Sequence, residues 1–514
     1  MIPRILLACS SGLFLILVFP KLSCAILAWI ALLPLFLALH RQGLLLSFAL
    51  GFVTGVIGIM GIFYWITLPA GVHVRDFLMM VAYGGLYFGG FAAMLNFLVA
   101  RTFLPLWVLA PFLWVTLEYI RSHFFFLEIP WALLGHSQYQ NLPLIQLSEF
   151  TGVYGISFLI VLANAALYEA WQSLGAVVKP AVISLGLVAV AWVYGWSILQ
   201  TAPEFQRAQV TVIQGNIPQD IKWDPASQQQ SLLRHIHLTE EALQGNSPAL
   251  IVWPETAVPG ALRKDGKPLE TLSTLAKSTK TFLVIGTAER PKFLEKHLST
   301  KNRFNSALLI SPLTDQIEQR YHKIKLLPFK EYLPYKDLFP WPRRFLSEAG
   351  NFLPGKEYTV FNIPGLNGHA PLKFSVLICW ETIFSNLVRQ FVLRGATFVI
   401  DIANEAWFGK SAAPYQFLSM NVFRAVENRR SIVRATNSGV SGFIDPYGRI
   451  LGQVEDNHQD IFVAGHLTKA IPLLHHTTFY THYGDLFAQT ASGVFILFLL
   501  YAIRPRGRLV TTVA

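Results

Sequence analysis

Charged residues and cysteines are both scarce in this 514-residue chain. Only 14% of its residues are charged, against about a quarter in an ordinary soluble domain, while 53% are hydrophobic. This composition indicates a protein that lies in a membrane over a large part of its length. The three cysteines, Cys9, Cys24 and Cys379, include no Cys-x-x-Cys pair, which excludes the zinc and redox motifs built on that spacing.

Basic runs, internal repeats and an evident cleavable signal are also absent. The net charge is +11, but no basic stretch is interleaved with aromatic residues, so no nucleic-acid partner is expected. In a membrane protein, an excess of Lys and Arg is typical of cytoplasmic loops and of contacts with lipid headgroups. The chain is long enough for two units of about 200 residues or more.

Apolar runs dominate residues 1–200 and return near the end of the chain. A membrane-spanning helix needs about 20 apolar residues, and the first two runs are short by that measure. The sequence predicts a membrane domain at 1–200 with seven transmembrane helices, an eighth helix at 486–503 and a tail at 504–514. The eight runs lie at 5–20, 23–39, 44–68, 77–100, 102–120, 151–173, 178–199 and 486–503.

The distribution of Lys and Arg predicts how these helices are oriented. With the N-terminus in the cytoplasm, seven basic residues fall on the inside and three on the outside, as the positive-inside rule favours. The large polar region then lies outside, which in a bacterium is the periplasm. A count of six spans before that region would reverse its side. The inside residues are Arg4, Arg41, Arg101, Lys179, Arg504, Arg506 and Arg508; the outside ones are Lys21, Arg75 and Arg121.

The region at 205–470 has the pattern of a layered α/β domain. Short runs rich in β-branched residues alternate with amphipathic stretches at 226–243 and 266–279, which favours an α/β architecture over a sandwich of strands alone. Nine strands are expected, at 208–213, 249–253, 281–286, 306–310, 374–378, 397–402, 431–434, 442–444 and 461–465. Helices are expected at 383–394 and 414–429.

Three reactive side chains fall at or near strand ends in this region. Glu255 follows the run ending at Trp253, Lys323 lies in an apolar neighbourhood, and Cys379 follows the buried run 374–378. Taken singly, each has an ordinary explanation: a turn carboxylate, a solvated lysine and a small buried thiol. Together they are what acyl transfer needs, because a carboxylate can take the thiol proton and a lysine can stabilise a tetrahedral oxyanion.

The motifs around these residues resemble those of a known enzyme family. The three side chains lie in Trp-Pro-Glu, Tyr-x-Lys and Cys-aromatic-Glu contexts, which resemble the Glu-Lys-Cys triad of the nitrilase superfamily. With the predicted membrane helices, the chain looks like the apolipoprotein N-acyltransferases of that superfamily. Further matching motifs are Gln214-Gly-Asn-Ile-Pro218, Asn305-Ser-Ala307, Leu327-Pro-Phe-Lys-Glu331, Asn404-Glu-Ala-Trp-Phe-Gly409 and Arg434-Ala-Thr-Asn-Ser-Gly439.

The resemblance implies a fold and a role for each site residue. It implies an αββα sandwich in which Glu255 is the general base, Lys323 stabilises the oxyanion and Cys379 is the nucleophile. Glu331 would be a second essential carboxylate near the lysine. Trp380 and Glu381 would flank the nucleophile, and Trp223, Trp407 and Asn305 would contact substrate. The chain departs from the usual family residues at Lys330, Trp380 and Glu405.

The resemblance also implies the reaction and its setting. Cys379 would take an acyl chain from a phospholipid such as phosphatidylethanolamine and pass it to the N-terminal amine of an apolipoprotein's S-diacylglyceryl cysteine. No cofactor or metal is implied, and a monomer in the bacterial inner membrane is expected. Two alternatives remain open: a membrane-tethered amidohydrolase that uses water as acceptor, and a transporter or scaffold whose polar domain only binds. The histidines at 475, 476 and 482 are not expected to hold a metal.

Overall fold

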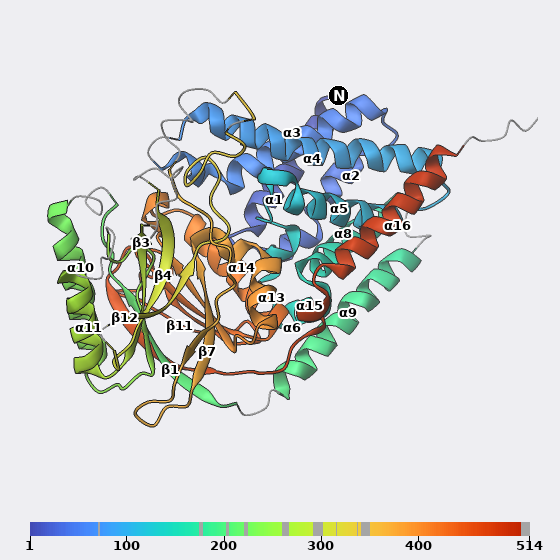
Figure 1. Ribbon diagram of the computed structural model, residues 1–514. Coiled ribbons are helices and arrows are strands. Elements are labelled where there is room, and N and C mark those ends of the chain that lie inside the picture. Colours follow the sequence, from blue (N-terminus) through green and yellow to red (C-terminus); the bar gives the residue numbers. More distant parts are fainter. Residues whose placement is uncertain are drawn as a thin grey trace, which may run out of the picture.

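The structure is a computed structural model in which a helical half and a sheet-containing half pack together (Figure 1). The helices of the first half form a bundle beside two stacked sheets. Helices α13 (Ser385–Leu393) and α14 (Ala413–Asn428) lie between this bundle and the strands. The described residues are 1–69, 72–173, 178–201, 205–219, 225–259, 267–290, 302–314, 316–336, 338–340 and 350–504.

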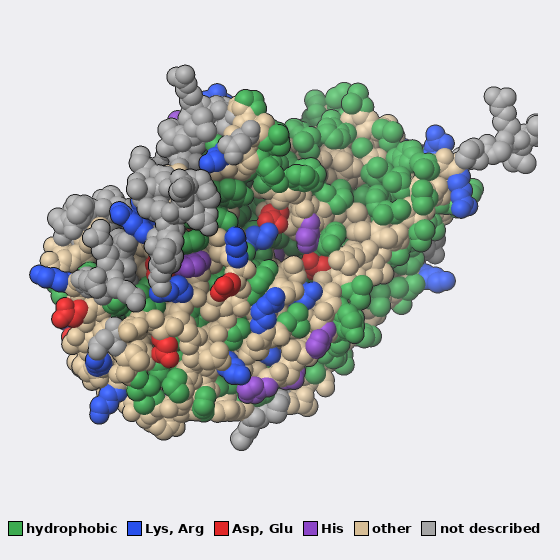
Figure 2. Space-filling view, viewed as in Figure 1, with side chains coloured by type: hydrophobic (Ala, Val, Ile, Leu, Met, Phe, Trp, Pro, Cys, Tyr) green, Lys and Arg blue, Asp and Glu red, His purple; other side chains and the backbone are tan. Residues whose placement is uncertain are grey.

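The helical half contains the apolar segments. Among the described residues, five helices are long and apolar enough to cross a membrane: α3 (Leu44–Ile62), α4 (Val74–Arg101), α8 (Val153–Gln172), α9 (Lys179–Gln200) and α16 (Leu486–Ile503). Helix α5 (Leu106–His123) and three shorter elements complete the bundle: α1 (Ile2–Val18), η1 (Ala25–Trp29) and α2 (Leu33–Leu39). Figure 2 shows hydrophobic side chains gathered over this half, as expected for lipid-facing helices.

Each apolar run of the sequence overlaps one of these helical elements. The run at 102–120 corresponds to α5, which also carries Glu118 and Arg121 in its last turns. The count of eight spans and their orientation stay predictions. The segments between α5 and α8 are short: η3 (Phe125–Leu127), η4 (Leu134–Gln138), α6 (Leu142–Ile145) and α7 (Ser148–Thr151).

The other half contains two six-stranded sheets. In the first, the order is β12 (Gly465–Pro472), β1 (Arg207–Gln214), β2 (Leu250–Val252), β3 (Phe282–Glu289), β4 (Phe304–Ile310) and β5 (Ile317–His322). In the second, it is β11 (Ile450–Gln453), β10 (Gly442–Ile444), β9 (Ser431–Thr436), β8 (Phe398–Ala403), β7 (Leu372–Ile378) and β6 (Phe361–Ile363). Strands β1–β3 are parallel, as are β7–β9.

The alternation of side chains along the strands builds four layers. Leu250 and Val252 of β2 belong to the core between the two sheets, whereas Ile251 packs against the outer helices, since successive side chains point to opposite faces. The outer helices of the first sheet are α10 (Pro225–Ala242) and α11 (Lys267–Thr279). On the second sheet, α13 and α14 form the outer layer. The predicted αββα sandwich beside a helical membrane domain is confirmed.

The prediction of a strand at 461–465 is wrong. The last strand of the first sheet is β12, which pairs antiparallel with β1 from Gly465 to Pro472. Residues 461–464 are an irregular buried segment instead. Its carbonyls accept side-chain hydrogen bonds that replace a ladder: Gln214 donates to Val463 O (3.0 Å) and Asn216 donates to Phe462 O (2.9 Å).

Helix α14 joins the two halves. All of its residues except Tyr415 are buried, which is unusual for an outer layer. The Gln416 side chain accepts hydrogen bonds from the indoles of Trp65 (3.2 Å) and Trp131 (2.9 Å), and it donates to Ile62 O (2.9 Å). The sheet-containing half is therefore fixed to the bundle by buried polar contacts.

Candidate active site

Cys379 lies at a strained turn between β7 and η5 (Cys379–Ile383). Its φ angle is +59°, a region that costs a non-glycine residue about 1–3 kcal/mol and that persists only where the surroundings enforce it. Such a turn at the end of a buried strand lifts a side chain out of the sheet while the strand holds its backbone still. The local structure therefore presents the thiol at the carboxyl end of β7.

Glu381 enforces this turn. Its Oε2 accepts from Ile378 N (2.8 Å), and its Oε1 accepts from Tyr321 OH (2.8 Å), Ile324 N (2.8 Å) and Lys325 N (3.0 Å). Burial raises the pKa of Glu381 to about 7 despite these donors and the nearby charge of Lys323. The carboxylate thus ties the end of β7 to the segment that follows β5.

Trp380 reinforces the same link. Its indole N–H donates to Lys325 O at 2.6 Å, and its ring meets Phe384 edge-on at 5.0 Å. The ammonium of Lys325 forms an ion pair with Glu128, in the segment just after α5. One side of the nucleophile turn is therefore connected to the helical half through Lys325.

Glu255 follows β2, and neutral donors hold both of its oxygens. Asn305 Nδ2 donates to Oε1 (2.8 Å), and the backbone N–H of Asn404 donates to Oε2 (2.9 Å). On the neighbouring strand, Gly286 permits a close approach, because a Cβ there would lie 2.5 Å from Pro254 O and 2.6 Å from Glu255 Cα. These two donors and the close approach of β3 orient the carboxylate at the end of β2.

Lys323 follows β5 and is almost completely buried, at 1% exposed. Its Nζ lies 3.0 Å from Oε1 and 2.9 Å from Oε2 of Glu331. Burial alone would lower the pKa of Lys323, but the charges of Glu331, Cys379 and Glu255 outweigh it and raise that pKa above its usual value. The ammonium therefore keeps its proton.

Asn305 lies between the two carboxylates. Besides Glu255, its Nδ2 donates to Glu331 Oε1 at 3.1 Å, and Glu331 Oε2 accepts from Leu327 N at 2.7 Å. The side chain of Asn305 thus bridges the two acids, and the substrate contact expected of it from the sequence stays a prediction. Glu331 pairs with Lys323, although Lys330 is adjacent to it in the sequence.

The charges around Cys379 decide its protonation. The residue keeps a partly accessible surface, yet protein surrounds most of it. Burial is the largest cause that raises the pKa of the thiol, and Glu255 raises it further. Lys323 lowers it, but by less, so the pKa stays well above its ordinary value. The resting thiol is protonated at neutral pH, and a nucleophilic thiolate requires a base to take its proton. The charges of Glu255 and Lys323 thus both reach this sulfur, with opposite effects on its pKa.

The remaining site predictions have different outcomes. Trp223 lies outside the described residues. Trp407, in η6 (Glu405–Phe408), is 39% exposed, while its neighbour Phe408 packs edge-on against Trp65 at 4.9 Å. The sequence did not predict that the backbone N–H of Asn404 donates a hydrogen bond to Glu255. The signal available was the Asn-Glu-Ala-Trp motif, which begins at this residue.

Glu405 belongs to a buried ion cluster beneath the nucleophile turn. Arg434 forms ion pairs with both Asp401 and Glu405, and all three side chains are buried. Gly439 faces this cluster, because a Cβ there would lie 1.7 Å from Glu405 Oε2. Among the described residues, no group of three or more His, Cys, Asp and Glu side chains is arranged to hold a metal ion.

An αββα sandwich carrying a buried Glu, Lys and Cys, fixed onto apolar helices, defines a membrane-embedded relative of the carbon-nitrogen hydrolases. A carbon-nitrogen hydrolase family model matches residues 209–465, and a model of the apolipoprotein N-acyltransferase N-terminal domain matches residues 11–166. The chain belongs to the apolipoprotein N-acyltransferase family.

Individual relatives agree with this assignment. The chain is 39% identical to the apolipoprotein N-acyltransferase of Geobacter metallireducens, over 95% of this chain and 93% of that protein. It is 28% identical to that of Chlorobaculum tepidum, over 93% and 92% of the two chains. Among solved structures, a nitrilase-superfamily protein of Saccharomyces cerevisiae, Nit3, matches with a TM-score of 0.39 and 18% identity, over 52% of this chain and 90% of its own.

Proposed function

We propose that this protein transfers an acyl chain from a phospholipid, through a thioester on Cys379, to the N-terminal amine of the S-diacylglyceryl cysteine of an apolipoprotein. The observation that carries the proposal is a set of contacts: Asn305 and Glu331 link Glu255 to Lys323, and Glu381 ties the strained turn of Cys379 to the backbone next to Lys323. The names of the relatives support the acceptor and the type of transfer.

In the first half-reaction, Glu255 takes the proton of the Cys379 thiol as the sulfur attacks the ester carbonyl of the phospholipid. The tetrahedral oxyanion is stabilised by the ammonium of Lys323, which Glu331 keeps charged. The C–O bond of the ester then breaks, and the leaving lysophospholipid alkoxide receives the proton from Glu255. The acyl group remains on the sulfur as a thioester.

In the second half-reaction, the free α-amine of the apolipoprotein attacks the thioester carbonyl. Glu255 accepts a proton from the amine, Lys323 again stabilises the oxyanion, and the C–S bond breaks to form an amide. The thiolate then recovers its proton from Glu255. A thioester suits this sequence, because it stores the acyl group in a form that an amine attacks readily.

The setting of the site suits two lipid substrates. Withdrawing an acyl chain from a bilayer costs about 0.8 kcal/mol per methylene, so an active site resting on membrane helices spares both substrates that cost. We infer that the catalytic domain (205–470) lies on the periplasmic side of the bacterial inner membrane, from the Lys and Arg distribution. The protein is proposed to act as a monomer without a cofactor.

The test is acylation of the purified full chain by phospholipid alone, followed by intact-mass measurement. We expect a hydroxylamine-labile adduct of one acyl group, absent in Cys379→Ala and retained in Cys24→Ala, which removes another free thiol. Addition of a diacylglyceryl-cysteine peptide should discharge the adduct onto the peptide. A wild-type protein that never forms the adduct, or an adduct that persists in Cys379→Ala, would refute the proposal.

A further inference from the structure

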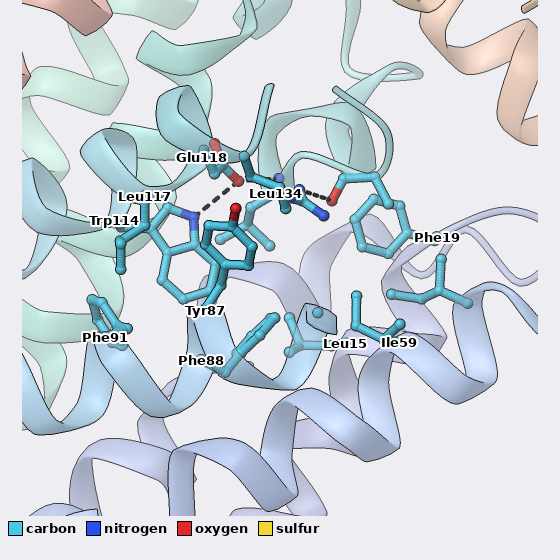
Figure 3. Close-up of a pocket in the computed structure, with 14 residues that line it drawn as sticks. Leu15, Phe19, Ile59, Tyr87, Phe88, Phe91, Trp114, Leu117, Glu118 and Leu134 are labelled. Carbon is cyan, nitrogen blue, oxygen red and sulfur yellow. Dashed lines mark hydrogen bonds between the residues drawn. The ribbon is translucent and has the colours of Figure 1, made fainter. Parts of the chain in front are cut away.

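A narrow cavity lies inside the helical half, apart from the catalytic cluster (Figure 3). The cavity has a volume of about 560 Å³, counted out to its open mouth. Figure 3 shows Leu15, Ile59 and Phe88 on one part of its wall and Tyr87 and Trp114 on another. A mostly apolar space of this size suits a hydrocarbon chain.

One end of this cavity is charged. Arg121, in the last turn of α5, lines it together with Glu118. Neutral donors hold one oxygen of Glu118, since Oε1 accepts from Trp114 Nε1 (2.9 Å) and from Leu134 N (2.7 Å), while Oε2 has no hydrogen-bond partner among the described residues. Within the part of the chain that the structure describes, Arg121 forms no ion pair, and its guanidinium makes one long hydrogen bond, to Ala132 O at 3.4 Å. A guanidinium in apolar surroundings requires an anionic partner.

The charged end faces the catalytic domain. Beyond Arg121, α5 ends at His123, and Glu128 a few residues later forms an ion pair with Lys325 of the catalytic domain. Trp114 lies seven residues earlier in α5, about 10 Å deeper in the bundle at 1.5 Å per residue, and there it packs edge-on against Phe91 at 5.0 Å. The cavity is thus polar at the level of the nearer membrane face and apolar below it, as a lipid is.

We propose that this cavity binds one acyl chain of a glycerophospholipid, with Arg121 pairing with the phosphate. A guanidinium binds a phosphate through two parallel N–H···O bonds, and the Tyr87 hydroxyl, which contacts Tyr83 OH at 2.8 Å, lines the same space. Charge decides between the two lipid substrates, because the diacylglyceryl group of an acceptor cysteine carries no anion beside its chains. That the bound lipid is the acyl donor rests on the proposed function, whereas the binding itself does not.

The test measures binding independently of the reaction. The full chain carrying Cys379→Ala is reconstituted with a phosphatidylethanolamine that bears a diazirine on one acyl chain, or with a diacylglycerol of the same chains. After photolysis, we expect phospholipid labels in the peptides of α1, α3, α4 and α5. In Arg121→Gln, the ratio of phospholipid to diacylglycerol labelling in these helices should fall about tenfold, as the loss of one charge-assisted pair predicts.

Two variants control for structural effects. Arg121→Lys keeps the charge and should restore most of the ratio, and Arg75→Gln removes an exposed arginine at the same end of the bundle and should leave the ratio unchanged. An unchanged ratio in Arg121→Gln, labelling outside these four helices, or a diacylglyceryl-cysteine peptide that labels them as strongly as phospholipid would overturn the proposal. Arg121-dependent labelling, combined with a wild-type protein whose Cys379 is never acylated, would refute the proposed function and support this site.

Discussion

Glu331→Gln tests how Lys323, which we propose stabilises the oxyanion, is kept charged. The substitution preserves the size of the side chain and removes the charge that lies 2.9 Å from Lys323 Nζ. Burial alone lowers the pKa of Lys323, and Glu331 is the largest of the charges that oppose it. In the variant that pKa should therefore fall. Because Lys323 acts in its protonated form, the alkaline limb of the rate–pH profile should move to lower pH.

The magnitude follows from the burial of the pair. Breaking a buried ion pair by removing one partner costs about 3–5 kcal/mol. The Glu331 side chain is 13% exposed, and a glutamine oxygen still accepts from Leu327 N, so we expect the lower end of that range. Loss of one oxyanion donor costs about 10²–10³ in rate. Since the lysine itself remains, we expect Cys379 acylation to slow by about tenfold to a hundredfold near neutral pH.

The assay is the rate of adduct formation on Cys379 across pH, by intact mass, with denaturant unfolding measured in parallel. Glu289→Gln is the matched control, because Glu289 is 12% exposed and pairs with Arg320 at 3.6 Å on the same sheet. It should lose some stability and keep the wild-type pH profile. A Glu331→Gln protein with an unchanged alkaline limb and an unchanged rate would show that Glu331 does not set the charge of Lys323.

Three further predictions concern the geometry around the triad. Tyr321→Phe removes a 2.8 Å donor to the buried Glu381 carboxylate and should destabilise the protein by about 1.5–3 kcal/mol in denaturant unfolding. Glu381 binds its proton more tightly when folded, with a pKa of about 7, so its contribution to stability falls as pH rises from about 4.5 to 7; Glu381→Gln should flatten that dependence in thermal melts. Gly286→Ala should displace Glu255 and slow acylation at least tenfold, whereas Gly90→Ala, which meets no neighbouring atom, should not.

The strands that were found from the sequence and those that were missed differ in one physical respect. The predicted ranges correspond to β1–β4 and β7–β10, all of which have neighbours on both sides. The strands that were missed or misplaced, β5, β6, β11 and β12, are the four edges of the two sheets. Edge strands are more exposed and carry polar side chains, as in Ile317–His322, so they lack the apolar runs that mark an interior strand.

The candidate site was predictable residue by residue but not as a set of contacts. Motifs marked Glu255, Lys323 and Cys379, because each follows a strand. They did not indicate that Glu381 would be held by Tyr321, 60 residues away, or that Asn305 would bridge two carboxylates. Those contacts depend on the register of β4 against β5 and on the packing of the two sheets, which no local pattern encodes.

Helix α14 contacts both the turn that begins with Cys379 and the membrane half. On its inner side, Asn421 accepts a hydrogen bond from Thr382 (2.9 Å) and Arg424 donates to Ile383 O (3.1 Å), so it anchors η5, the turn that begins with Cys379. Toward the bundle, Arg424 pairs with Glu427, whose Oε1 accepts from Val153 N at the start of α8 (3.2 Å). One ion pair thus connects the nucleophile turn to a membrane helix. A soluble sandwich would leave these polar groups facing water. Here they are buried against the bundle, so the membrane half helps to position the thiol.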